Sequence, residues 1–145
     1  MTEVAFHFGA ADRLAYTCRL LRKATASGAR LVVRSDPEML GALDAALWDL
    51  SPVDFVTHCG GDATDAVKAR SAVLLQQAQK IVAGEAPILV NLADDVPEGF
   101  EKFERVIEIV STDEQERSLA RGRWKHYTER GYTITRHDLK SKAGN

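Results

Sequence analysis

Three cationic side chains recur at four-residue intervals near the end of this 145-residue chain. Arg117, Arg121 and Lys125 share one face of a helix if this segment is helical, because residues four apart are neighbours on a helix surface. Such a basic ladder can hold carboxylates through charge-assisted hydrogen bonds. It can equally be a solvated face that interacts with the helix dipole, and the spacing alone does not separate the two interpretations.

The charge of the chain is unevenly distributed around this ladder. From Asp113 to the end there are eight Lys or Arg and five Asp or Glu, a balance of +3, although the whole chain carries −2. Trp124 lies within the ladder and can supply an apolar wall. An acidic peptide that contains an aromatic residue would satisfy both the cations and the tryptophan.

Two other aromatic residues, Trp48 and Phe55, lie close together around Pro52. A tryptophan at the end of a helix often closes the edge of a core. If both rings are exposed, they instead form an interface patch of the kind that dominates binding energy. The sequence leaves these two interpretations even.

Catalytic and metal-binding groups are not evident in the sequence. His58 and Cys59 are adjacent, but neighbours on a strand point to opposite faces, so we expect one buried and one exposed side chain rather than a catalytic pair. Asp94 and Asp95 are typical of an acidic surface loop more than of a metal site. We therefore predict no catalytic residue, no metal and no cofactor.

A nucleotide-binding loop is also missing. The first expected turn, from Phe8 to Asp12, lacks the Gly-x-Gly-x-x-Gly pattern that brings a pyrophosphate to a helix N-terminus, and no Gly-x-x-x-x-Gly-Lys-Ser/Thr occurs elsewhere. The alternative function is a small nucleotide-binding or enzymatic α/β domain acting at the C-terminal ends of its strands. It predicts a pocket near Gly9 to Asp12.

Strands and helices alternate along most of the chain. Apolar runs predict strands at 4–9, 29–34, 55–58, 87–92 and 105–110, and caps with apolar periodicity predict helices at about 12–28, 36–48 and 113–130, with a short helical turn at 100–103. The stretch 65–83 fits a helix by propensity, or a strand around 72–76. We expect a single-domain Rossmann-like α/β fold over 1–139, with a mostly parallel sheet flanked by helices and a disordered tail at 140–145.

Composition limits the class of protein. The hydrophobic content of 45% suffices for one core, and the net charge of −2 argues against a surface that coats a phosphate backbone. Cys18 and Cys59 lack the spacing of a zinc site and are expected to be reduced. Neither a signal peptide nor an apolar run of about 18 residues occurs, so we expect a soluble cytoplasmic protein with no membrane partner.

Two segments resemble a known family, the chi subunit of bacterial DNA polymerase III. One is Leu43-Asp44-Ala45-Ala46-Leu47-Trp48, followed by Pro52 and Phe55-Val56-Thr57-His58. The other is Ala120-Arg121-Gly122-Arg123-Trp124-Lys125-His126-Tyr127, which ends in Gly131-Tyr132. The apolar strands at 88–92 and 105–110 fall in the family's order, so the resemblance covers nearly the whole chain.

The resemblance implies a non-catalytic accessory subunit of the polymerase holoenzyme. It implies that the last helix binds the acidic C-terminal tail of the single-stranded DNA-binding protein, with Arg121, Trp124 and Lys125 at the matching positions and Val110 as a pocket wall. Arg117 does not belong to the carried motif and is added from helical spacing alone.

The same resemblance implies a second contact and one more strand. Trp48 and Phe55 match positions that bind the psi subunit or another clamp-loader component, and DNA would be contacted mainly indirectly. The family also has a strand before its strand of the Ile-Leu-Val type, which favours the extended interpretation of 72–76.

Overall fold

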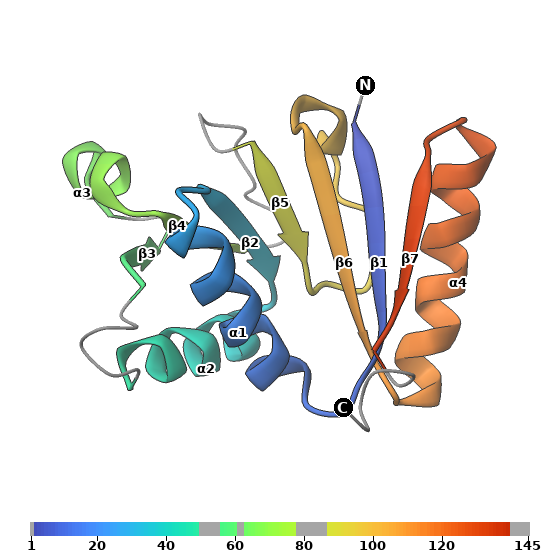
Figure 1. Ribbon diagram of the computed structural model, residues 1–145, viewed down its shortest axis with the longest axis horizontal. Helices are drawn as coiled ribbons and strands as arrows, with labels where there is room; N and C mark the ends of the chain where they lie inside the picture. The colour runs from blue at the N-terminus through green and yellow to red at the C-terminus, as the bar shows by residue number, and fades with distance from the viewer. Residues whose placement is uncertain (1, 50–55, 61–62, 78–86, 140–145) are drawn as a thin grey trace.

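The computed structural model describes residues 2–49, 56–60, 63–77 and 87–139, which form one sheet with helices on both faces (Figure 1). The described strands are β1 (Glu3–Ala10), β2 (Leu31–Ser35), β3 (His58–Gly60), β4 (Val73–Gln77), β5 (Ile88–Asn91), β6 (Arg105–Ser111) and β7 (Ile134–Asp138). The described helices are α1 (Arg13–Ala26), α2 (Pro37–Trp48), α3 (Asp65–Arg70), the 3-10 helix η2 (Phe100–Lys102) and α4 (Glu114–Glu129).

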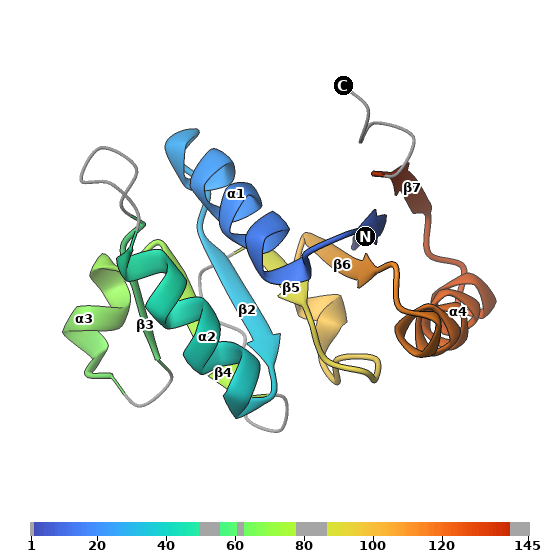
Figure 2. The same ribbon diagram turned by 90° about the horizontal axis from the view of Figure 1, so that it is seen from below.

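The sheet has the order β3-β4-β2-β5-β6-β1-β7, and every pairing between the described strands is parallel. The predicted α/β class with a mostly parallel sheet is thus confirmed. In Figures 1 and 2, α3 and α4 lie at opposite ends of this sheet. The expected tail at 140–145 lies outside the described residues.

The predicted helix starts are correct because each has a capping aspartate. The side chains of Asp12, Asp36 and Asp113 each accept a hydrogen bond from the backbone N–H three residues later, at 2.8 to 3.0 Å. Gly28 and Gly131 follow the ends of α1 and α4 with φ of 90° and 81°, a left-handed conformation that suits glycine.

Three parts of the prediction need correction. The strand expected at 55–58 lies later, at His58–Gly60. The ambiguous stretch contains both a short helix, α3, and the strand β4, so the extended interpretation of 72–76 is confirmed while 78–83 lies outside the described residues. The edge strand β7 was not predicted, since its half-exposed sequence Ile-Thr-Arg-His-Asp lacks a buried apolar run.

The core has two parts, one on each face of the sheet. In β2, Leu31 and Val33 face α1 and α2, whereas Val32 between them packs on the α4 side. A central parallel strand covered on both faces is apolar throughout, as β2 largely is. None of the described helices has the length and apolar character needed to cross a membrane.

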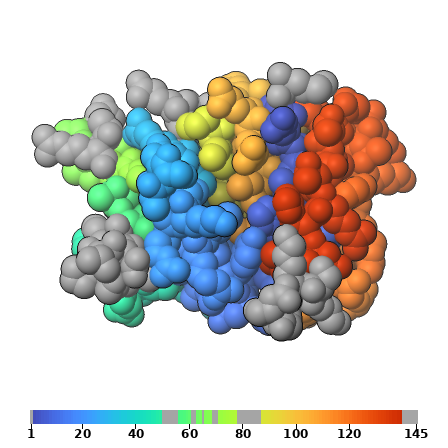
Figure 3. Space-filling model, in the orientation of Figure 1, coloured from blue at the N-terminus to red at the C-terminus, as the bar shows by residue number. Residues whose placement is uncertain are grey.

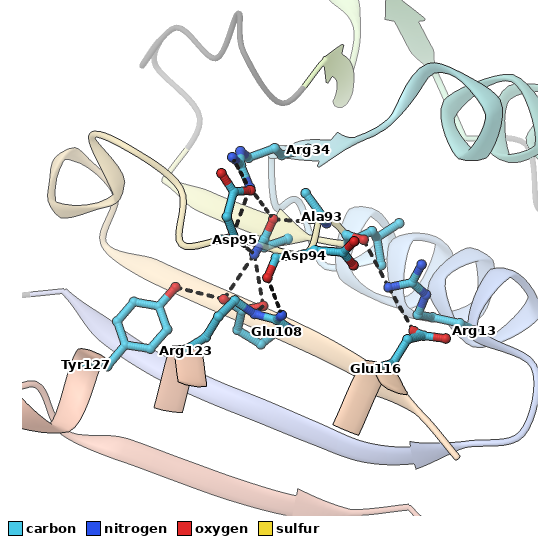
Figure 4. A network of polar contacts seen from close by, with 11 residues as sticks. Arg13, Arg34, Ala93, Asp94, Asp95, Glu108, Glu116, Arg123 and Tyr127 are labelled. Carbon is cyan, nitrogen blue, oxygen red and sulfur yellow. Dashed lines mark hydrogen bonds and ion pairs between the residues drawn. The ribbon is translucent and has the colours of Figure 1, made fainter. Parts of the chain in front are cut away.

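Helix α4 is attached to the sheet by a buried polar network as well as by apolar packing (Figure 4). Glu108, on β6, is fully buried. Its carboxylate accepts hydrogen bonds from Arg123 Nε at 3.1 Å, from Tyr127 Oη at 2.7 Å and from Asn91 Nδ2 at 3.0 and 3.1 Å. Arg123 and Tyr127 both come from α4, so the helix supplies two of the three partners of this carboxylate.

The network continues from β5 to the end of β2. Arg34 donates to Asn91 Oδ1 at 2.9 Å and forms an ion pair with Asp95 at 2.8 Å. Arg123 also donates to the backbone carbonyl of Asp94 at 2.8 Å. The acidic loop that follows β5 is therefore held by two arginines from different elements, β2 and α4.

Burial is the main cause of the raised pKa values in this network. It raises the pKa of the Glu108 carboxyl, and Arg123 and the hydrogen bonds from Tyr127 and Asn91 act against that rise. Burial and the neighbouring Glu108 raise the pKa of Tyr127, which keeps its hydroxyl protonated as a donor. Arg123 is only 6% exposed, so it is a core residue rather than a member of the basic ladder.

Replacing Arg123 with methionine should destabilise the fold by about 3 kcal/mol or more, because it leaves a buried carboxylate without its charged partner. Burial already raises the pKa of the Glu108 carboxyl in the folded protein, and the substitution removes Arg123, a charge that acts against this rise. The folded variant therefore takes up a proton at Glu108 more readily than the unfolded chain does. The deficit should therefore shrink as pH falls from 7 towards about 4.3. Chemical denaturation of both proteins across this pH range measures the effect.

The double variant Arg123→Met, Glu108→Gln provides the control, since it removes both charges. It should be less destabilised than Arg123→Met alone and should lose the extra pH dependence. Additive losses in the double variant would contradict the coupling of these two side chains.

Candidate functional site

A groove of about 390 Å³ lies where α4, β7 and the end of β1 meet. Its lining comes from these elements and from the link between β6 and α4: Phe8, Gly9, Thr112, Arg117, Arg121, Trp124, Arg136 and Asp138. Figure 3 shows α1 over the middle of the face seen there, and β7 with α4 along its right-hand side. The groove is thus at the β7 edge of the sheet, near the C-terminal end of β1.

A bulge in β1 shapes one end of the groove. The register between β1 and β6 runs regularly from Glu3–Arg105 to Phe8–Val110 and then shifts between Phe8 and Ala10. The residue between them, Gly9, has φ of 84°, which a residue with a Cβ adopts only with strain. The bulge ends the regular pairing next to the groove and exposes the Gly9 backbone to it.

The floor of the groove is aromatic. Phe8 and Trp124 are half-buried and their ring centroids are 6.0 Å apart. Beneath them the buried ring of Phe6 stacks on Phe8 at 5.5 Å and contacts Trp124 at 5.1 Å. This cluster gives the floor a fixed apolar surface against which another ring or aliphatic side chain can pack.

Arginines stand on both walls of the groove. On α4, Arg117 and Arg121 share the carboxylate of Glu114, at 3.5 and 3.2 Å. On β7, the guanidinium of Arg136 lies over the Phe8 ring, 5.1 Å from its centroid. Asp138, on the same strand, also lines the groove. The arrangement suits a ligand that combines an apolar group with carboxylates.

The structure brings three of the predicted binding residues together, Arg117, Arg121 and Trp124, and places the other two elsewhere. Helical geometry puts Trp124 about 100°, Arg121 about 160° and Lys125 about 200° around the axis from the inward-facing Arg123. Lys125 therefore lies beyond the groove, 76% exposed and 3.9 Å from Glu129. Val110 is 1% exposed and belongs to the core under α4, not to the groove lining.

Four lining residues were missed by sequence reasoning, namely Phe8, Thr112, Arg136 and Asp138, while Gly9 was named only for the alternative nucleotide pocket. Two of them lie on the unpredicted strand β7. The alternation of Ile134, Arg136 and Asp138 on one side and Thr135 and His137 on the other was the signal available in this segment. It was too polar to indicate a strand, because an edge strand exposes much of both faces.

A second candidate surface surrounds Trp48, at the end of α2. Its side chain is 61% exposed and its ring contacts His58 edge-on, with centroids 5.2 Å apart. His58 lies on β3, at the sheet edge opposite β7. Phe55 lies outside the described residues. Trp48 is thus an exposed interface candidate far across the sheet from the groove.

The prediction that one of His58 and Cys59 is exposed was wrong, since both side chains are buried. Helices α2 and α3 both contact β3, the strand that carries these two residues. His58 Nδ1 lies 2.7 Å from the Val56 carbonyl, and Nε2 lies 3.0 Å from the Asp44 carboxylate. The other thiol, Cys18, is also buried, and burial raises its pKa, which disfavours the reactive thiolate.

The residues proposed for the alternative nucleotide site have structural contacts. Asp12 caps α1 through its bond to the Ala15 N–H, and Gly9 forms the β1 bulge. The described groove extends from Gly9 towards α4 and β7, away from Asp12, which is not among its lining residues. The geometry at this strand end favours the α4 side over the α1 side.

Sequence comparison gives full-length matches to one family. A family model described as DNA polymerase III chi subunit, HolC, matches residues 1–135. The DNA polymerase III subunit chi of Pseudomonas aeruginosa is 31% identical over 149 residues, covering 96% of this chain and 98% of that protein. The DNA polymerase III subunit chi of Haemophilus influenzae is 24% identical over 120 residues, covering 81% of each chain.

Structural comparison supports the fold. The C-terminal domain of the DEAD-box protein Dbp5 superposes with a TM-score of 0.66 at 14% identity, covering 97% of this chain and 91% of that one. At this identity the likeness concerns the arrangement of the parallel sheet and its helices alone.

Proposed function

We propose that this chain, which belongs to the DNA polymerase III chi subunit family, binds the acidic C-terminal tail of the single-stranded DNA-binding protein in the groove between α4 and β7. Family membership makes it an accessory subunit in DNA replication. The observation that carries the proposal is the pair of α4 arginines beside the half-buried Trp124 and Phe8 rings.

The dimensions and charge of the groove favour a peptide over DNA. Its volume of about 390 Å³ is near the lower end of the range for small-ligand sites, about 300–1,000 Å³, and suits a short segment. The segment from Asp113 to the end carries a net charge of +3, whereas the chain as a whole carries −2. Since strong backbone binding needs many phosphate contacts, DNA would be reached mainly through the bound partner.

We expect the affinity for a single tail to be modest, and the many tails on one coated DNA strand to compensate for it. A disordered tail loses conformational freedom when it is ordered in the groove, and this cost offsets part of the contact energy. A DNA strand coated with the partner displays many tails. Local concentration then keeps the subunit near the strand while each single contact remains reversible.

Calorimetric titration with a synthetic peptide copying this tail, from the same organism, tests the proposal. We expect saturable binding that weakens as salt rises, because charge pairing contributes. Arg121→Ala should weaken binding by about 1–2 kcal/mol, roughly tenfold, since it removes a charged hydrogen-bond donor from the groove wall. Lys125→Ala should have a smaller effect, because Lys125 lies beyond the groove.

Arg130→Ala is the matched control for charge. Arg130 is an exposed arginine at the end of α4 and does not line the groove. It should leave affinity nearly unchanged at moderate salt. Equal losses for Arg121→Ala and Arg130→Ala would show that only the general field of the helix matters, and no binding by the unmodified chain would refute the site.

The second part of the proposal concerns Trp48. We propose that Trp48, with Phe55, contacts the psi subunit or another clamp-loader component, so that one edge of the sheet faces the polymerase and the other the coated strand. The 61% exposure of a tryptophan supports this, because such anchors dominate interface energetics. A linker needs two separate surfaces, and β3 and β7 are the two edges of one sheet.

Trp48→Ala should abolish co-purification with the partner subunit and leave binding to the tail peptide unchanged. Truncating an interface tryptophan commonly costs about 2 kcal/mol or more. Leu119→Ala serves as control, since Leu119 is an exposed apolar residue on α4. Retained co-purification of the Trp48 variant, or loss of tail binding with it, would contradict the separation of the two surfaces.

A further inference from the structure

We propose that the outer edge of β7 accepts an extended segment of the acidic peptide as an additional strand of the sheet. Main-chain hydrogen bonds then hold the peptide alongside the groove, in addition to the contacts of its side chains. The proposal rests on the function proposed above and adds to it the conformation in which the peptide is bound.

The backbone of β7 alternates between β1 and the open edge. The Val4 N–H donates to the Thr133 carbonyl at 3.2 Å, and the Leu139 N–H donates to the Phe8 carbonyl at 2.7 Å. The parallel register between these two bonds has no shift. Odd-numbered residues of β7 therefore direct their N–H and C=O groups to β1, and even-numbered residues direct theirs away from it.

Ile134 and Arg136 thus present their main-chain groups at the edge of the sheet. β7 is the last strand in the described sheet order, and no described residue forms a hydrogen bond with the backbone N–H or C=O of these two residues. Figure 2 shows α1 and α4 on opposite faces of the sheet, with β7 at its end. A row of such main-chain groups is a template for another extended chain.

The same two residues connect this edge to the groove. Their side chains lie on the α4 face of the sheet, where Ile134 packs on the core cluster under α4 and Arg136 lines the groove. A peptide alongside β7 directs every second side chain to this face. Acidic side chains at those positions approach Arg136 and, across the groove, Arg117 and Arg121. In this mode of binding, main-chain bonds provide affinity and the alternate side chains provide specificity.

Amide hydrogen exchange followed by NMR tests the proposal on the full chain, with and without a saturating amount of the synthetic tail peptide. The amides of Ile134 and Arg136 should exchange fast in the free protein and about tenfold or more slowly in the complex, because they gain hydrogen-bond acceptors. The amides of Thr135 and His137 are the internal control, since their bonds to β1 protect them in both states.

Peptides with one N-methylated backbone amide test the same bonds from the ligand's side. N-methylation removes a donor and adds bulk, so it should weaken binding about tenfold at every second position of the bound segment and less than about twofold at the positions between. On the protein, Arg136→Pro removes the outward N–H without removing a bond to β1. It should bind the peptide about threefold or more weakly than Arg136→Ala, which lacks the same side chain but keeps that N–H.

Saturable binding without slower exchange at Ile134 and Arg136, or without a two-residue period among the N-methylated peptides, would overturn the added strand and leave the proposed function intact. Slow exchange of these amides in the free protein would also overturn it, because the edge would then be occupied by a second copy or by another segment of the chain. Absence of binding by the unmodified chain would refute both proposals. Circular dichroism checks that the variants fold, and if Arg136→Pro does not, hydrogen exchange and the N-methylated peptides decide between the same outcomes.

Discussion

The buried carboxylate of Glu108 is the constraint on which the arrangement of the last helix depends. A charge inside the core must be paired, and α4 supplies Arg123 and Tyr127 for that purpose. Together with Ala120, these two residues form the buried face of α4. Once that face is fixed, helical geometry directs Trp124, Arg117 and Arg121 to the side where β7 lies and turns Lys125 outward. An interaction that binds no ligand thus sets the composition of the groove.

The same network links three adjacent strands in the middle of the sheet, β2, β5 and β6. Asn91 contacts Glu108 on one side and Arg34 on the other, so β2, β5, β6 and α4 share one set of hydrogen bonds. In α/β proteins the C-terminal edge of the sheet usually holds the ligand. Here it is filled by the protein's own side chains and by the acidic loop after β5, and the groove is displaced towards β7. Among the described residues, this strand edge therefore contributes hydrogen bonds to the fold rather than a groove.

The parallel sheet also keeps the two proposed contact surfaces apart. Trp48 packs against the β3 edge, and the groove lies at the β7 edge. The sheet lies between them, so each proposed partner would have an edge of its own. One wall of the groove belongs to the last strand of the fold, whose position is set by its pairing with β1 and not by burial of its own side chains.

The sequence by itself determined the α/β class, the helix starts at Asp12, Asp36 and Asp113, the family, and the basic face of the last helix, because caps, apolar periodicity and helical spacing are local properties. It did not determine which cations share a site. Arg123 and Lys125 differ in environment only because a buried carboxylate selects the inward face, and Glu108 lies fifteen residues earlier on a strand. Arg136 and Phe8 meet through pairing of the first and last strands, which no local pattern encodes. Tertiary structure alone decided these contacts, since they join residues remote in the chain.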